Sequence, residues 1–214
     1  MITSGRIPAV AVLLDMDGVL VDSTATVEDH WSRWANRRGL PPSDVLRFAH
    51  GSPISEVVAR FVDPDEVSDE SDWVEGLSSE PTIDQAMPGA LTILTQKLMP
   101  IAVVSSATRQ VVEARLKRAG LPMPTVLVGA DDVPHGKPDP APYLLAASRL
   151  RVNINECVGV EDTPVGLRAL LASGAVPLAV LTTHTADELA GAHALLDDLG
   201  QLHVGVDSVS WPRS

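Results

Sequence analysis

The sequence has very few cysteines and aromatic side chains. Its single cysteine, Cys157, cannot form an internal disulfide, which is typical of a protein from a reducing compartment. Cys157 lies within an apolar run, so we expect it to pack in the core. Only 3% of the residues are aromatic although 45% are hydrophobic, so the core must consist mainly of aliphatic side chains.

Positive charge is also scarce. The chain has 16 Lys and Arg against 28 Asp and Glu, which gives a formal net charge of −12. Such an acidic chain is a poor candidate for binding nucleic acid through its phosphates. The same charge would repel an anionic substrate, so a phosphate-bearing ligand would need local cations or a metal ion.

Long apolar segments are missing as well. No apolar run approaches the roughly 18 residues of a membrane span, and no basic and apolar leader precedes residue 10. We therefore expect a cytoplasmic protein that binds neither a membrane nor nucleic acid.

The sequence does contain apolar, strand-like runs that alternate with amphipathic helical patterns. This alternation predicts an α/β fold of the Rossmann-like, doubly wound type, with a mostly parallel sheet covered by helices on both faces. We expect strands at 10–14, 101–105, 125–129, 157–160, 178–181 and, weakly, 204–206, and helices at 107–119, 141–150, 165–172 and 186–199.

About 86 residues separate the first two expected strands, far more than a simple crossover needs. Helical patterns over 26–38, 43–48 and 54–61 lie in this interval. We predict a small helical cap domain over residues 25–86, inserted after the first strand of a core formed by residues 1–24 and 87–214. We expect Trp31 and Trp34 in the cap's own core and the acidic run 63–72 on its solvated surface.

Polar side chains follow the expected strands at four places. Because the carboxyl ends of parallel strands meet at one edge of a sheet, we expect these side chains to converge. Together they would supply carboxylates for a divalent metal and a lysine and hydroxyls for a phosphoryl group. The four elements are Asp15 with Asp17, Ser105 with Ser106, Lys137 in the loop 136–140, and Glu161 with Asp162.

Each element also has a simpler interpretation. Asp and Ser near a strand end are frequent helix N-caps, and Asp162 directly precedes Thr163 and Pro164. A single lysine such as Lys137 is usually a solvated surface charge. Four such elements in order at strand ends are harder to explain by capping, so we favour a phosphoryl-transfer site.

The four elements resemble the motifs of the haloacid-dehalogenase-like hydrolase superfamily. LLDMDG is similar to its first motif, VVSSA to its second, HGKPDP to its third and GVEDTPVG to its fourth. The helical insert stands where that family has its first-type cap, and AHGSPISEVVARF in the insert resembles the cap of small sugar phosphatases. The resemblance covers almost the whole chain and implies a phosphatase for 2-deoxyglucose 6-phosphate, a hexitol phosphate, glycerol phosphate or a related ester.

The resemblance also implies roles for the acidic residues. Asp15 would attack phosphorus and form an aspartyl-phosphate, and Asp17 would act as general acid and then as general base. Mg²⁺ would be held by the Asp15 carboxylate, the Asp17 backbone carbonyl and the Asp162 carboxylate. Glu161 would be a second acid that receives hydrogen bonds from metal-bound water.

Further residues would bind the substrate. By the same resemblance, Ser105 and the Ser106 amide would hold phosphate oxygens, and Lys137 would neutralise charge on the nucleophile and the transferring group. In the cap, His50 and Gly51 would present an imidazole and free amides to a polyol, with a helix-capping turn as the equally weighted alternative.

Two other functions remain as alternatives, a sugar phosphomutase and a non-enzymatic phosphate-binding or signalling module. Phosphomutases that resemble this chain have a histidine at the position of Val27 and an arginine at that of Ile54, so both residues favour hydrolysis. Phosphonatases need a cap lysine, and residues 25–86 contain none. Receiver-like signalling modules carry the acid pair before the phosphoacceptor and lack such an insert.

Overall fold

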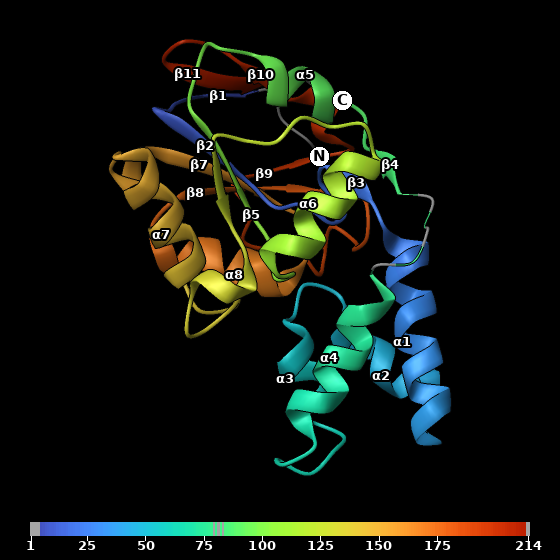
Figure 1. Ribbon diagram of the computed structural model, residues 1–214. Coiled ribbons are helices and arrows are strands. Elements are labelled where there is room, and N and C mark those ends of the chain that lie inside the picture. Colours follow the sequence, from blue (N-terminus) through green and yellow to red (C-terminus); the bar gives the residue numbers. More distant parts are fainter. Residues whose placement is uncertain (1–4, 79, 81, 83, 213–214) are drawn as a thin grey trace.

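A computed structural model describes residues 5–78, 80, 82 and 84–212. Its body is built on a six-stranded parallel sheet with the order β6-β5-β2-β7-β8-β9 (Figure 1). The predicted Rossmann-like α/β fold is therefore confirmed. The strands are β2 (Ala11–Leu14), β5 (Ile101–Val104), β6 (Val126–Val128), β7 (Cys157–Glu161), β8 (Val176–Val180) and β9 (Ala194–Leu196).

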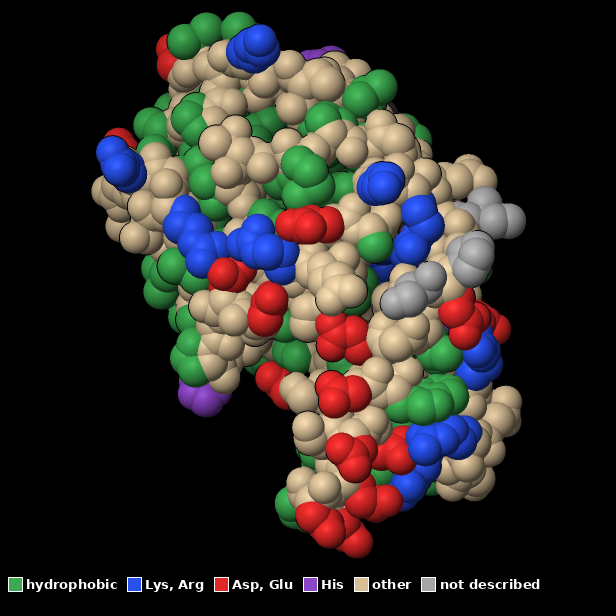
Figure 2. Space-filling model, in the orientation of Figure 1, with side chains coloured by type: hydrophobic (Ala, Val, Ile, Leu, Met, Phe, Trp, Pro, Cys, Tyr) green, Lys and Arg blue, Asp and Glu red, His purple; other side chains and the backbone are tan. Residues whose placement is uncertain are grey.

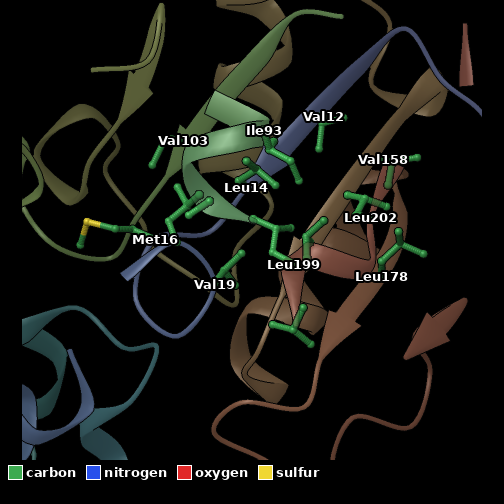
Figure 3. Packing of buried hydrophobic residues seen from close by; sticks show 14 of the residues in the cluster. Val12, Leu14, Met16, Val19, Ile93, Val103, Val158, Leu178, Leu199 and Leu202 are labelled. Atoms are coloured by element: carbon green, nitrogen blue, oxygen red, sulfur yellow. The ribbon is translucent and has the colours of Figure 1, made fainter. Parts of the chain in front are cut away.

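Helices cover both faces of this sheet. Alternate side chains of the central strand β2 point to opposite faces, as a pleated strand requires. Ala11 and Leu13 pack with α7 (Ala141–Leu150) and α8 (Pro164–Ser173), in a layer that also buries Cys157. Val12 and Leu14 pack on the other side with α5 (Ala90–Thr95) and α6 (Arg109–Arg118), the layer shown in Figure 3. The core is aliphatic, as the composition predicts.

A smaller antiparallel sheet adjoins this second layer. It has the order β1-β11-β10 and consists of β1 (Gly5–Pro8), β10 (His203–Val204) and β11 (Ser208–Trp211). The weak strand expected at 204–206 thus belongs to this sheet and ends at Val204. The amide of Gly205 donates to the carbonyl of Ser208 at 2.8 Å, which turns the chain back after β10.

The helix expected over 186–199 is wrong. The chain forms turns over 186–191, then the edge strand β9, then a 3₁₀ turn η3 (Leu199–Gln201). Gly191 has a φ of 117°, which a right-handed helix excludes. Past it, the amide of His193 donates to the carbonyl of Pro177 at 2.7 Å and starts the pairing with β8.

Four helices form a separate lobe below the sheet body in Figure 1. This helical lobe consists of α1 (Thr24–Arg38), α2 (Pro42–Ala49), α3 (Ile54–Val58) and α4 (Val67–Leu77). Trp31 and Trp34 are buried in its own apolar cluster, as predicted. The chain enters and leaves the lobe through a short antiparallel pair, β3 (Val21–Asp22) and β4 (Gln85–Ala86).

Helix α4 covers part of the acidic run expected to be solvated. Figure 2 shows acidic side chains gathered over this lobe. Glu70, however, is buried, where it accepts a hydrogen bond from Trp34 Nε1 at 2.7 Å and pairs with Arg37 at 2.5 Å and Arg38 at 3.4 Å. A buried carboxylate needs such partners. The expectation of a solvated surface is therefore wrong at Glu70.

The helices are short. The longest of those described, α1, has 15 residues. Within the described ranges, none combines the length and apolar character required to cross a membrane.

Candidate active site

The polar residues that follow the strands gather at one edge of the parallel sheet. Strand β2 ends directly before Asp15, and its neighbours β5 and β7 end directly before Ser105 and at Glu161. The amide of Asp15 donates to the carbonyl of Val160 in β7 at 3.0 Å, so the parallel register continues past the end of β2. This register carries the side chains to the edge where α/β proteins bind ligands.

A cavity lies at this edge, between the sheet body and the helical lobe. Ser106, after β5, donates from Oγ to the carbonyl of Gly51 in the lobe at 2.8 Å and thereby joins the two walls. Ser105, Lys137 and Glu161 do not line this cavity, and the last two lie behind Asp15. The predicted site residues that do line it are Asp15, Asp17, Asp162, Ser106, His50 and Gly51.

Lys137 is buried against Asp15, with 2% of its surface exposed. Its Nζ donates to Asp15 Oδ1 at 2.5 Å and to the carbonyl of Val104 at 3.1 Å, and it lies 2.6 Å from Glu161 Oε1. Burial lowers the pKa of Lys137, but the two carboxylates outweigh burial and raise that pKa above its usual value. The interpretation of Lys137 as a solvated surface charge is therefore wrong.

Glu161 is fully buried, and both of its oxygens are occupied by protein donors. Oε1 accepts a hydrogen bond from Tyr143 at 2.5 Å in addition to its contact with Lys137. Oε2 accepts from the amide of Asp162 at 3.2 Å and from the hydroxyl of Thr163 at 3.3 Å. Glu161 therefore anchors Lys137 and the chain at Asp162.

Three buried carboxylates, those of Asp15, Glu161 and Asp162, bring one oxygen each within 4.8 Å of the others. In Asp162, Oδ2 accepts from the Thr183 hydroxyl at 2.5 Å, whereas the buried Oδ1 has no hydrogen-bond partner in the described residues. A buried carboxylate oxygen without a partner is costly, and a cation would satisfy it. The donor set of hard carboxylate oxygens fits Mg²⁺.

Burial and neighbouring negative charge disfavour the ionised forms of Asp15 and Asp162. Burial, and next the charge of Glu161, raises the pKa of Asp15 to about 8. Burial, and next the charge of Asp15, raises the pKa of Asp162 well above its usual value. Cations beside these groups favour ionisation. Lys137 beside Asp15 therefore favours the ionised form of that carboxyl, and a cation held at this edge would favour it further.

Asp17 makes a different set of contacts. Its Oδ1 accepts hydrogen bonds from Arg115 Nη1, at 2.6 Å, and from the hydroxyl of Ser23. The next residue, Gly18, has a φ of 77°, and a Cβ there would collide with the Asp162 carboxylate. Glycine is thus required at this turn, both for its conformation and for the close approach of the two loops.

Arg115, Tyr143, Thr183 and Ser23 belong to the site but to none of the motifs. Arg115 could have been identified from the sequence, because it lies on the same helix face as the apolar residues Val111 and Leu116. An apolar residue is expected at its position on this buried face of α6. A charged residue on such a face requires an acceptor nearby. No sequence pattern identifies Thr183 as a site residue, since it lies in a loop after β8.

Comparison with known proteins identifies the family that these motifs suggest. A family model described as haloacid dehalogenase-like hydrolase matches residues 10–174. Hexitol phosphatase A of Escherichia coli (strain K12) is 38% identical over 199 residues, which is 90% of this chain and 92% of that protein. Validoxylamine A 7'-phosphate phosphatase of Streptomyces hygroscopicus subsp. limoneus is 37% identical over 212 residues, 94% of this chain and 96% of that protein.

The solved structures include a β-phosphoglucomutase from Clostridium difficile. It superposes with a TM-score of 0.78 over 91% of this chain and 93% of that one, at 21% identity. At this identity the match shows the shared fold alone. The resemblance predicted from the four motifs is confirmed by the family match and the curated relatives.

Proposed function

Because this chain belongs to the haloacid dehalogenase-like hydrolase family, we propose that it is a Mg²⁺-dependent phosphatase for a small sugar or polyol phosphate monoester. Two of its relatives are named as phosphatases of a hexitol and of validoxylamine A 7'-phosphate, both esters of polyhydroxylated compounds. The observation that carries the proposal is the buried Asp15 carboxylate, with Lys137 at 2.5 Å on one side and the unpartnered oxygen of Asp162 nearby.

The proposed reaction has two steps. In the first, an oxygen of Asp15 forms a bond to phosphorus while the ester P–O bond breaks, and Asp17 gives a proton to the leaving alcohol oxygen. In the second, Asp17 takes a proton from water, the water oxygen attacks phosphorus, and the Asp15 carboxylate leaves. The products are the alcohol and inorganic phosphate. Asp15 and Asp17 both face the cavity, as this sequence of steps requires.

Charge on the phosphoryl group would be neutralised from several sides. A bound Mg²⁺ supplies electrostatic stabilisation of the phosphoryl oxygens. We propose that the Asp15 and Asp162 carboxylates and the Asp17 carbonyl hold it. Lys137 adds a fixed cation, and Ser106, which lines the cavity, would bind a phosphate oxygen through its amide. Ser105 Oγ accepts from the Ala107 amide at 3.1 Å and keeps its own hydrogen for a phosphate oxygen.

We further propose that residues 25–86 act as a cap over a core formed by residues 1–24 and 87–214. In support, the helical lobe has its own apolar cluster and contributes His50 and Gly51 to the cavity wall. Burial lowers the pKa of His50, so that its neutral imidazole can both donate to and accept from a substrate hydroxyl.

The single cysteine, Cys157, favours the cytoplasm as the location of the protein.

The second candidate is a sugar phosphomutase, a class represented among the proteins with this fold. Val27 and Ile54, which stand where such mutases have a histidine and an arginine, both line the cavity. Neither side chain offers a polar group to the departing sugar phosphate. We therefore propose water, and not a sugar hydroxyl, as the acceptor of the phosphoryl group.

The proposal is tested by release of inorganic phosphate from hexitol, glycerol and 2-deoxyglucose phosphates with Mg²⁺. Chelation by EDTA should abolish activity, and Asp15→Asn should lower kcat by about 10⁴-fold because the nucleophile is lost. The exposed Asp65 supplies the control variant Asp65→Asn, which should retain full activity. Absence of phosphate release from every ester would refute the proposal, and an isomerised sugar phosphate as product would establish the mutase.

A further inference from the structure

Arg115 is a cation that lines the cavity, and the proposed reaction steps do not use it. It extends from α6 with 6% of its surface exposed and lines the cavity. A guanidinium carries five N–H donors. Its only acceptor in the described residues is Asp17 Oδ1, and its buried Nε has no hydrogen-bond partner there. Unpartnered buried donors are costly, so Arg115 has capacity for further acceptors.

The contact with Asp17 places these donors beside the leaving group. Arg115 Nη1 and the Ser23 hydroxyl both donate to Oδ1 of Asp17, and Oδ2 receives no hydrogen bond from the described residues. A general acid must come within about 3 Å of the oxygen that it protonates. The Arg115 guanidinium lies 2.6 Å from the same carboxylate, so it would be close to the carbon atoms of a leaving group that Asp17 protonates.

The neighbouring wall of the cavity also carries polar groups. His30, from α1 in the helical lobe, is 4% exposed and lines the cavity together with Ser23, Ser78 and Arg115. Burial, and next the charge of Arg115, lowers the pKa of His30, so its imidazole is neutral at pH 7. A neutral imidazole has one donor and one acceptor, and both suit a hydroxyl.

Arg115 also improves the charge balance of the site. The four carboxylates of Asp15, Asp17, Glu161 and Asp162 face two cations, Lys137 and Arg115. One divalent cation would neutralise this set when all four acids are ionised. The spare donors of Arg115 are thus available to uncharged acceptors such as hydroxyl oxygens.

We propose that Arg115 determines specificity by binding hydroxyl groups of a polyhydroxylated leaving group while it orients Asp17. The inference rests on the proposed function and deepens it, since it identifies the residue that distinguishes a polyol phosphate from a simple alkyl phosphate. An alkyl leaving group would displace water from the guanidinium and leave its N–H groups without acceptors. Sites built to hydrogen-bond a hydroxyl reject analogues that lack it.

The test uses esters that differ only in their hydroxyl groups. The two pairs are a hexitol phosphate with hexyl phosphate, and glycerol phosphate with propyl phosphate. The preference is the ratio of kcat/KM within each pair, measured with Mg²⁺ for the wild type, Arg115→Gln and Arg115→Lys. Lys117→Gln is the control, because Lys117 is an exposed cation on the same helix. Acetyl phosphate, whose acetate leaving group has no hydroxyl, reports whether the Asp15 centre is intact.

We expect the wild type and Lys117→Gln to prefer the hydroxylated ester by about 10²-fold, and Arg115→Gln to lose most of this preference while still hydrolysing acetyl phosphate. Arg115→Lys, which keeps the charge but not the planar fork, should be intermediate. An unchanged preference in Arg115→Gln would overturn the inference and leave the phosphatase proposal standing. If Arg115→Gln no longer hydrolyses acetyl phosphate, its Asp15 centre is not intact. The preference of Arg115→Lys for the hydroxylated ester then tests the inference, and an unchanged preference there would overturn it. A wild type that hydrolyses none of the four monoesters would overturn the inference, and one that also releases no phosphate from 2-deoxyglucose phosphate would overturn the phosphatase proposal as well.

Discussion

The two oxygens of the Asp162 carboxylate have different surroundings. Its Oδ2 accepts a hydrogen bond from Thr183 at 2.5 Å, and the same hydroxyl lies 3.1 Å from the backbone carbonyl of Asp162. These contacts hold the carboxylate in one orientation and leave Oδ1 without a hydrogen-bond partner among the described residues. Outer partners of this kind commonly tune the affinity of a metal site.

Removal of the Thr183 hydroxyl should weaken metal binding directly. We expect Thr183→Val to lower the Mg²⁺ affinity about 10-fold, because the Asp162 carboxylate is no longer held in its orientation. Isothermal titration with Mg²⁺ and no substrate measures this effect apart from catalysis. Thr185→Val is the matched control, since the Thr185 hydroxyl lies in the same loop but donates to Glu188 at 2.8 Å. Equal affinities for all three proteins would contradict the expectation.

Helix α8 depends on a close approach between its backbone and the acidic cluster. Thr163 caps the helix by accepting a hydrogen bond from the Gly166 amide at 3.1 Å, and Pro164 occupies its first turn. A Cβ on Gly166 would collide with the carboxylate of Glu161. The glycine therefore allows the helix to lie against the residue that anchors Lys137.

Two glycine substitutions in helices should have opposite effects on stability. Gly166→Ala should destabilise by about 1–3 kcal/mol, because Glu161 must move, and should lower kcat with it. Gly76→Ala, in α4, meets no atom within 4 Å and should stabilise by about 0.5–1 kcal/mol through the lower flexibility of alanine in the unfolded chain. Urea unfolding of both variants measures the two changes in the free energy of unfolding. Changes of the same sign would contradict the proposed roles of the two glycines.

At the scale of the whole molecule, arginine–carboxylate pairs connect distant elements of this acidic chain. Asp132 follows β6 in a 3₁₀ turn η1 (Ala130–Asp132). It binds Arg149 of α7 at 2.6 Å and Arg109 of α6 at 3.1 Å. The hydrogen bond from Arg149 is the largest cause that lowers the pKa of Asp132, which falls to about 2.

This pKa predicts how stability changes with pH. Since the folded-state pKa of Asp132 lies below its unfolded value, the carboxylate stabilises the fold at neutral pH and loses this effect as pH falls from 4 towards 2. Asp132→Asn should therefore cost about 1–2 kcal/mol at pH 7, a value reduced for the partly exposed arginines, and about half as much at pH 3. Urea unfolding at both pH values measures the stability cost of Asp132→Asn, with Asp65→Asn as control. A cost independent of pH would exclude the ion pair as its source.

Much of the fold follows from local pattern. The apolar run before Asp15 predicts β2, and the helical pattern over residues 107–119 predicts α6, because these patterns depend on a few neighbouring residues. The helix predicted over 186–199 is wrong because the apolar residues of this region suit either a helix or an edge strand. Only the neighbouring β8, together with the backbone at Gly191, decides for the strand. The pairing of β1 with β11 joins segments about 200 residues apart and has no local signal.

The candidate site likewise combines features that the sequence predicts with contacts that only the tertiary structure shows. The sequence by itself determined that carboxylates, serines and a lysine follow successive strands, since strand ends and turns are local features, and parallel strands must bring them to one edge. Only the tertiary structure decided that Lys137 is buried against Asp15, that Thr183 holds Asp162, and that Arg115 reaches Asp17 from 98 residues away. Those contacts depend on which helix faces and loops meet across the sheet edge, and the packing of the whole chain sets that geometry.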